Sequence, residues 1–399
     1  MKKIIIIGGG ISGLSCAFDL INKGFSLSEK TGLTNWGVYP VYNPYFIFWS
    51  RIISTLIWPF YFFCNLYRKS YSLNDENINA ILICQYHRIG DVLLIAPVLR
   101  SLKIRYPQAH LTLLCCQDAE ILARDLELAD EVIGIEIPWT NWDWSLFKWL
   151  KVRSIARNFR KQNIDIAIDF KGDLRNSWFL WHVQPQMSLG YTDTGGSFFY
   201  THPKPFPAGV HQTERSLQLI SYLGCDSKMM DEKKSIYHDQ GFIVFHTGGT
   251  DPKRSWPEIK WVELAESLSR DHKIAIVKTP ETGPVIRRMK ERKLRVEIFE
   301  GDLIAFKQWL KNQKMLIGID SMPGHLAAYL GIPVISIFGS QDPNLTCPLG
   351  KWTTIIHPDI PCHHQRDHWR LCAKCMASID GEKVSSAVVD LISRVKNRQ

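Results

Sequence analysis

Short apolar runs alternate with helix-like patterns along most of the chain. Between residues 80 and 170 the runs are ILICQY, LTLLCC, EVIGIEI and IDIAIDF, and amphipathic segments separate them. A polar, irregular stretch at 225–240 interrupts this alternation, which then resumes with FIVFHT, KIAIVK, MLIGID and PVISIF. Buried strands that alternate with helices are typical of parallel, doubly wound sheets. The pattern therefore predicts an α/β protein with two Rossmann-like domains, at 80–230 and 240–399.

The first 32 residues have a different character. An apolar run leads into a glycine turn with Gly8, Gly10 and Gly13, a helical pattern follows, and Glu29 comes after it. This is the outline of a dinucleotide-binding fingerprint and resembles the start of flavin-dependent oxidoreductases. Glu29 comes early for that pattern, and nothing like the rest of a flavin domain follows. We therefore expect a βαβ-like remnant at 1–32 without bound FAD, and keep an FAD- or NAD-dependent oxidoreductase as an alternative.

Residues 33–79 contain a hydrophobic segment and a polar linker. Aromatic and aliphatic side chains dominate 45–67, but Arg51 and Pro59 interrupt them. A charge at membrane depth is costly and proline breaks a helix interior, so a segment at the membrane interface fits better than a spanning helix. A hydrophobic helix packed on the protein body explains the same pattern. The sequence leaves both interpretations open.

Composition narrows the partners and the compartment. The 399 residues are 45% hydrophobic and 22% charged, as in ordinary globular proteins, and the net charge of +9 favours anionic partners. The ten cysteines do not have the spacing of a secreted disulfide framework. We expect a cytoplasmic protein, at most peripheral on the cytoplasmic face of the membrane.

A strand end carries the first chemical motif. The run ILICQY leads to Gly90 and Asp91, and Asp91 opens a helix in which Pro97 and RSLKIRYP follow. Asp91 has the position of an ordinary helix N-cap, but strand ends of this kind also face the ligand crevice. The whole combination resembles the N-terminal signature of the heptosyltransferases of glycosyltransferase family 9. A second segment, IDIAIDFKGDLRNSWF, is similar to a later part of that family's first domain. Its candidates for the acceptor side are Asp169, Lys171 and Arg175.

The second half carries cations and an acidic strand end. Lys253 and Arg254 follow a glycine turn and precede a helix, where they can neutralise a diphosphate. Ser255 is an extra residue relative to the family motif, so the sequence leaves open which cation reaches the phosphate. The segment LIGIDSMPGHLAAYLGIPVISIFGSQDP resembles the family's donor-binding signature, although Met322 stands where glycine is common. The resemblance implies that Asp320 holds sugar hydroxyls and that the nucleotide side is formed by Ser321, Gly324, His325, Gly339 and Ser340.

These residues cover the roles that glycosyl transfer requires. Asp91 would deprotonate the acceptor hydroxyl, Asp320 would position the donor sugar, and the cations would support the departing diphosphate. Direct displacement would invert the anomeric configuration. The sequence has no D-x-D triplet, so we expect no catalytic metal and no required cofactor. Cys362, His363, His364, Cys372 and Cys375 offer zinc ligands, but they include a single CxxC, and we predict no metal there.

The resemblance implies a complete reaction. The fold would be GT-B, in which two Rossmann-like domains face a cleft. The donor would be ADP-L-glycero-β-D-manno-heptose, and the acceptor a sugar of the lipopolysaccharide core or a related glycan. We expect no nucleic-acid partner. A GT-B protein that binds its ligands without turnover is a further alternative, for which Met322 and the extra N-terminal region give modest support.

Overall fold

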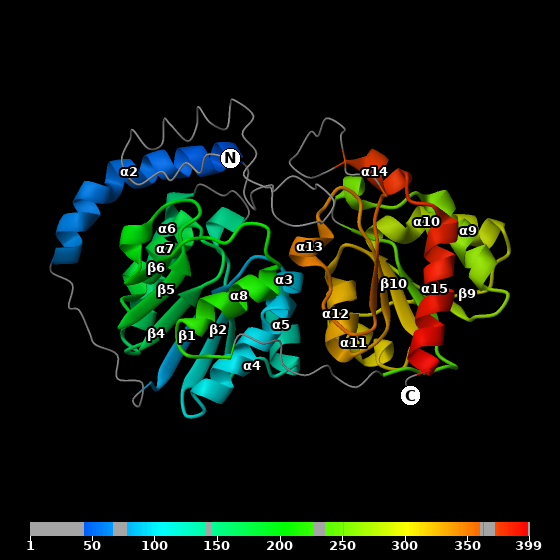
Figure 1. Cartoon of the computed structure of the whole chain (residues 1–399), viewed down its shortest axis with the longest axis horizontal. Helices are drawn as coiled ribbons and strands as arrows, with labels where there is room; N and C mark the ends of the chain where they lie inside the picture. Colours follow the sequence, from blue (N-terminus) through cyan, green and yellow to red (C-terminus); the bar gives the residue numbers. More distant parts are fainter. Residues whose placement is uncertain are drawn as a thin grey trace, which may run out of the picture. The chain divides into compact units, whose positions relative to one another are not determined.

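The computed structural model contains two parallel β-sheets with helices packed on them (Figure 1). The described residues are 44–66, 78–140, 145–226, 236–249, 251–359, 362 and 372–397. Each sheet has six strands. The expected pair of doubly wound α/β lobes is thereby confirmed. The glycine-rich segment with Gly8, Gly10, Gly13 and Glu29 lies outside the described residues.

The first sheet has the strand order β3-β2-β1-β4-β5-β6. Its strands are β1 (Ala80–Gln85), β2 (His110–Cys115), β3 (Glu131–Gly134), β4 (Ile166–Asp169), β5 (Met187–Tyr191) and β6 (His202–Lys204). Successive side chains of β1 enter different cores, because side chains alternate across a strand. Ile83 packs in the core that includes residues of α4, α5 and α8, and Leu82 packs in the core under α6 and α7. The helices are α3 (Ile89–Leu94), α4 (Ala96–Arg105), α5 (Gln117–Asp125), α6 (Leu146–Arg160), α7 (Leu174–Val183) and α8 (Gln212–Ser221), with the short turns η2 (Pro138–Thr140) and η3 (Ser197–Phe199).

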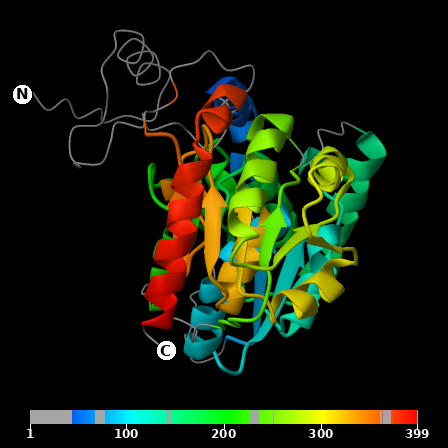
Figure 2. The ribbon, with the colours of Figure 1, turned by 90° about the vertical axis from the view of Figure 1, so that its right-hand side faces the viewer.

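The second sheet has the order β12-β11-β10-β7-β8-β9. Its strands are β7 (Ile243–His246), β8 (Ile274–Val277), β9 (Val296–Phe299), β10 (Met315–Ile319), β11 (Val334–Ile337) and β12 (Thr353–Ile356). Helices α9, α10 and α15 contribute to the core on one face, and α11 and α12 to the core on the other. Figure 2 shows α15, in red, along the sheet, where it contacts β11, β12 and α9. The helices are α9 (Glu258–Leu268), α10 (Gly283–Glu291), α11 (Leu303–Leu310), α12 (Met322–Leu330), α13 (Pro343–Thr346), α14 (Ala373–Ala377) and α15 (Gly381–Lys396), with η4 (Pro252–Arg254) and η5 (Pro280–Thr282).

Both sheets reverse their winding direction at an equivalent place. The first strand of each sheet, β1 or β7, lies between the second strand and the fourth, so the chain changes side between β1 and β4 and between β7 and β10. In open α/β sheets, ligands bind beyond the carboxyl ends of the strands at such switch points. The loops that follow β1, β4, β7 and β10 are therefore the expected walls of a site.

Helix α2 (Pro44–Leu66) packs on the first lobe through its polar positions. The Arg51 guanidinium donates to the carbonyl of Asp193 at 2.9 Å, and the Asn65 amide donates to the carbonyl of Phe198 at 2.7 Å. The contacting residues recur at helical spacing on one side: Arg51, Ser54, Tyr61 and Asn65. The large apolar side chains most exposed to solvent lie on the other side: Tyr45, Trp49, Leu56, Phe60 and Phe63. This helix thus reverses the usual arrangement of a soluble amphipathic helix.

Candidate active site

The predicted catalytic, acceptor-side and donor-binding residues lie at the ends of the four strands beside the two switch points. Asp91 lies in the first turn of α3 after β1, and Asp169 ends β4. In the second sheet, Arg254 ends η4 after β7, and Asp320 comes directly after β10. Parallel strands within a sheet end at the same edge. The sequence therefore places its chemical groups at two strand edges.

Asp91 forms an ion pair with a buried lysine. Its Oδ2 lies 3.1 Å from Nζ of Lys171, with side-chain exposures of 17% for Asp91 and 8% for Lys171. Burial by itself raises the pKa of Asp91, but the charge and hydrogen bond of Lys171, together with His87 and Gln212, lower it, so the net pKa is below the ordinary value. The carboxylate remains ionised at neutral pH and keeps enough exposure to meet a substrate hydroxyl. These are the properties of a general base.

Lys171 is held in place from two sides. Its Nζ lies 3.3 Å from Oε1 of Gln212, in α8, and its backbone N–H donates to the Asp169 carboxylate at 3.2 Å. Gly172 completes the turn with φ +70°, a left-handed conformation that favours glycine, and a side chain there would meet the backbone of Tyr191. The lysine is therefore positioned by the fold of the strand end rather than by its own flexible stem.

Asp169 supports this turn from below. It is fully buried, and its carboxylate accepts hydrogen bonds from Asn176 at 2.9 Å and from the Tyr200 hydroxyl at 2.8 Å, besides those from the turn. Burial raises its pKa to about 6 although these hydrogen bonds lower it. Arg175 pairs with Asp173 at 2.6 Å and lies over the ring of Phe46 in α2. Among the three acceptor-side candidates, Lys171 is the one that forms the ion pair with Asp91.

The second lobe contributes an acid–cation pair. Nη1 of Arg254 lies 3.5 Å from Oδ2 of Asp320, whose side chain is 10% exposed. Burial raises the pKa of Asp320 to about 6, Arg254 lowers it, and the charge of Asp91 raises it. Arg254 is therefore the cation that reaches Asp320, while Lys253 lies beside it on η4, where its N–H donates to Asp251 at 2.9 Å.

The start of α12 offers backbone donors near this pair. Ser321 is the N-cap residue, but its hydroxyl donates to the Ile319 carbonyl at 3.1 Å and does not cap the helix. The amides of the first turn therefore have no side-chain acceptor from the cap, which suits an anion. Gly324 and His325 are buried in this turn. Met322 begins the helix in a right-handed conformation, so the missing glycine creates no strain there.

Several contacts join the two lobes around these groups. A Cβ placed on Gly90 would lie 3.1 Å from the ring of His325, so Gly90 gives the second lobe room beside Asp91. Nε2 of His211 lies 3.1 Å from the Cys347 carbonyl oxygen. Lys307 in α11 forms an ion pair with Asp125 in α5. Asp91 and Asp320 therefore both lie near the junction of the lobes, close enough for the charge of Asp91 to raise the pKa of Asp320.

The predicted nucleotide-side glycine lies against α14. A Cβ on Gly339 would come within 2.7 Å of the Met376 sulfur, so this turn admits no side chain. Ser340 follows it and is buried. Helix α14 also packs on η4, which carries Lys253 and Arg254. The two predicted donor segments thus share one supporting helix.

Sequence reasoning missed two groups beside Asp91. His87 is partly buried, and desolvation together with the charge of Lys171 lowers its pKa to about 4, so it is neutral at physiological pH. Gln212 accepts a hydrogen bond from Lys171, and its side chain also lowers the pKa of Asp91. His87 comes at a strand end four residues before Asp91, which was a usable signal. Gln212 begins α8, and its role depends on the packing of that helix.

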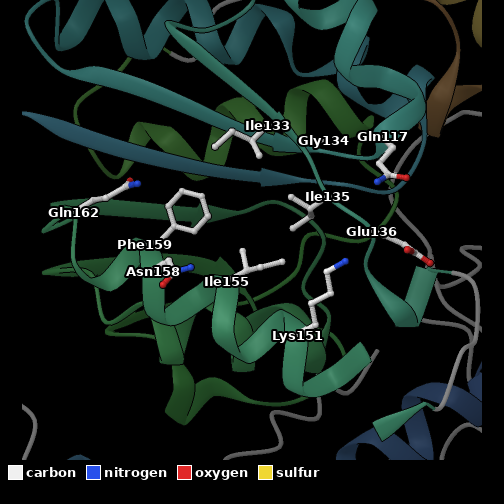
Figure 3. A pocket seen from close by; sticks show the side chains of 10 residues that line it. All are labelled: Gln117, Ile133, Gly134, Ile135, Glu136, Lys151, Ile155, Asn158, Phe159 and Gln162. Carbon is white, nitrogen blue, oxygen red and sulfur yellow. The ribbon is translucent and has the colours of Figure 1, made fainter. Parts of the chain in front are cut away.

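A separate pocket of about 320 Å³ lies at the β3 edge of the first sheet (Figure 3). Ile133, Ile155 and Phe159 supply much of its apolar lining, and Lys151 and Glu136 lie at its sides. It contains none of the predicted site residues. The chemistry of Asp91 and Asp320 therefore belongs to the junction of the lobes and not to this pocket.

Comparison with known proteins decides the family. A model of "Glycosyltransferase family 9 (heptosyltransferase)" matches residues 152–374. This chain belongs to glycosyltransferase family 9. Lipopolysaccharide heptosyltransferase 1 of Pseudomonas aeruginosa is 25% identical over 304 residues, which cover 71% of this chain and 84% of that protein. Lipopolysaccharide heptosyltransferase 3 of Escherichia coli K12 is 24% identical over 344 residues, with 77% and 96% covered.

Solved structures confirm the fold of this family 9 member. E. coli heptosyltransferase WaaC with ADP superimposes with a TM-score of 0.64 at 19% identity, covering 78% of this chain and 99% of WaaC. The expected GT-B fold is confirmed, and the chain is a glycosyltransferase. The oxidoreductase alternative rested on a segment outside the described residues and receives no support from these relatives.

Proposed function

We propose that this glycosyltransferase moves a heptosyl residue from ADP-L-glycero-β-D-manno-heptose to a sugar of the lipopolysaccharide core, with inversion. The observation that carries the proposal is the meeting of the Asp91–Lys171 pair of one lobe with the Asp320–Arg254 pair of the other. The names of the related lipopolysaccharide heptosyltransferases support the choice of sugar and acceptor. The two pairs provide a base on one side and donor-binding groups on the other.

The residues suggest a single displacement. The acceptor oxygen attacks the anomeric carbon while the bond from that carbon to the β-phosphate oxygen breaks, and Asp91 receives the acceptor proton. Lys171 keeps Asp91 ionised and oriented. Arg254, Lys253 and the first-turn amides of α12 stabilise the negative charge that develops on the departing ADP. Because these cations can replace a bound Mg²⁺, we expect transfer without added divalent ions.

The reaction is tested by mass spectrometry of transfer and ADP release. Purified full chain is incubated with ADP-heptose or other nucleotide sugars and a truncated lipopolysaccharide acceptor. Transfer from ADP-heptose supports the proposal. Transfer from another donor alone would reject heptose but keep the active site, and the absence of turnover with every donor and acceptor would favour the binding-protein alternative.

The pH profile should identify Asp320. Its pKa of about 6 places protonation in an accessible range, whereas the pKa values of His87, His211 and His325 are lowered by burial to about 4. Protonation removes an acceptor for sugar hydroxyls, so kcat/KM for the donor should fall as the pH drops below about 6 and level off above it.

The control for this pH profile is Asp169, the other carboxyl of the site whose pKa is raised to about 6. We expect Asp320→Asn to remove the acidic limb from the residual activity and Asp169→Asn to retain it. A limb that survives in Asp320→Asn and disappears in Asp169→Asn would assign it to the buried support of Lys171 instead.

We further propose that α2 attaches the enzyme to the cytoplasmic face of the membrane. Within the described residues, Tyr45–Leu66 is long and apolar enough to cross a membrane, by length and composition alone. Its polar positions are already occupied by the first lobe, through Arg51 and Asn65. Leu56 and Phe60 are 74% and 67% exposed on the other side. A helix that lies in the membrane interface would place its apolar side in the lipid and its polar side on the protein. A lipid-linked acceptor would explain why this helix packs on the lobe that carries Asp91.

Basic residues lie around the helix on which α2 packs. Tyr61 of α2 packs against Trp181 of α7. The next residue of α7 is His182, whose pKa is lowered to about 4 by burial and by the charges of Arg153, Arg157 and Arg160 in α6. Positive charge near the helix that carries α2 suits a surface of anionic lipid.

Replacing the outer apolar face should release the protein from vesicles. We expect the double variant Leu56→Glu and Phe60→Glu to bind anionic vesicles roughly 100-fold more weakly, because two large side chains no longer enter the lipid. Cosedimentation with vesicles measures this. Ile121→Glu, at another exposed apolar position that is 64% exposed in α5, is the matched control. Equal binding of wild type and double variant would exclude α2 as the contact.

A further inference from the structure

Three cysteines form a compact group in the second lobe. The sulfur atoms of Cys362, Cys372 and Cys375 all lie within 4.8 Å of one another, and all three side chains are buried. They form a cluster of their own, apart from the two cores that cover the sheet. None of the three is part of a disulfide. Such a group is unusual in a core, where a single thiol would pack as an ordinary small apolar side chain.

We propose that Cys362, Cys372 and Cys375 bind one Zn²⁺ ion as thiolates. Zinc bound to sulfur at about 2.3 Å holds tetrahedral thiolates about 3.8 Å apart, so a small contraction of this group would suffice. The spacing Cys372-x-x-Cys375 places one ligand at the N-cap of α14 and the other in its first turns. Three ligands come from these residues, and the fourth position is left to a water molecule or another donor.

The chemistry of the thiols agrees with a bound cation. Zinc binds cysteine as the thiolate, so the ion would deprotonate the sulfurs that it joins. A disulfide would satisfy two of the sulfurs and leave the third. A thiophilic metal uses all three.

The zinc site would stabilise a helix that touches both donor segments. Helix α14 has five residues, too few for a helix to be stable by itself. It packs on η4, which carries Arg254, and its Met376 fills the space beside Gly339. Lys260 adds a further tie, donating to the carbonyls of Ala377 and Ile379 at 2.8 and 2.7 Å. The ion would therefore affect donor binding by holding α14 against η4 and Gly339, and it would take no part in the chemical step.

Metal content tests the site directly. Untagged full chain is purified without thiol reductant from zinc-supplemented cells and analysed by mass spectrometry for metals. We expect about one Zn²⁺ per chain in wild type and in Cys225→Ser, a buried cysteine of the first lobe, and a large loss in Cys372→Ser and Cys375→Ser. Zinc-free wild type, iron in place of zinc, or full zinc retention in both variants would overturn the proposal.

A second measurement covers variants that fail to fold. A mercurial that blocks thiols should release zinc from the wild type, and Co²⁺ added to the zinc-free chain should give the visible absorption of a tetrahedral thiolate site. No such spectrum would count against the site. The role of the ion rests on the proposed function and is read from ADP affinity, which should fall by about tenfold on zinc removal. Unchanged ADP affinity would overturn that role. If the protein bound zinc but did not transfer heptose, only the proposed sugar donor would be rejected.

Discussion

Asp91→Asn is expected to lower kcat by about 10²–10⁴-fold, the usual contribution of a positioned general base. The amide keeps the size of the carboxylate but cannot accept the acceptor proton, and it leaves the buried Lys171 without its anion, 3.1 Å away. ADP binding should be preserved, because the donor cations belong to the other lobe. Steady-state rates by mass spectrometry and ADP titration by calorimetry separate the two effects.

The control for this variant is Asp118→Asn. Asp118 is also an acid in the first turn of a helix that follows a strand, but it is exposed and has no part in the lobe junction. It should leave kcat unchanged. If kcat of Asp91→Asn equalled that of the wild type, as is expected for the control, Asp91 would be an ordinary residue at a helix terminus. The neighbouring His87 would then be the next base to examine.

Arg254→Ala is expected to reduce kcat/KM for the donor by about 10²–10³-fold, the range found when one preorganised charge-stabilising group is removed. Arg254 is the cation that reaches Asp320, at 3.5 Å, so its loss removes both diphosphate neutralisation and the group that restrains the pKa of Asp320. The acidic limb of the pH profile should consequently move upward. Kinetics across pH with the natural donor measure both changes.

Two comparisons give this result its meaning. Lys253→Ala should have a smaller effect, because the ion pair with Asp320 is formed by Arg254, the next residue of η4. Arg288→Ala, which breaks a surface pair with Glu258, should have none. A larger loss in Lys253→Ala than in Arg254→Ala would exchange their roles. Equal and negligible losses in both would remove η4 from the donor site.

The strands that the pattern predicted are those with continuous apolar runs. β1, β2, β4, β7, β8, β10 and β11 are buried along most of their length, and such runs are recognisable because both faces of a parallel sheet are covered. The run EVIGIEI also predicted β3, which is only partly buried. The missed strands were β5, β6, β9 and β12. β6 consists of His202–Lys204 and is mostly exposed at the sheet edge, and β9 and β12 are only partly buried edge strands. Their formation depends on pairing with a neighbour, which local pattern does not record.

The sequence by itself determined the two α/β lobes and the strand ends that carry Asp91, Arg254 and Asp320, because periodicity and glycine turns are local properties. Tertiary structure decided which groups meet. It buried Asp169 as a support and brought Gln212 to Lys171. It also turned the apolar face of α2 outward and brought together Cys362, Cys372 and Cys375, which the sequence offered as zinc ligands without showing that they meet. These outcomes depend on contacts between residues far apart in the chain, and no pattern along the sequence specifies such distances.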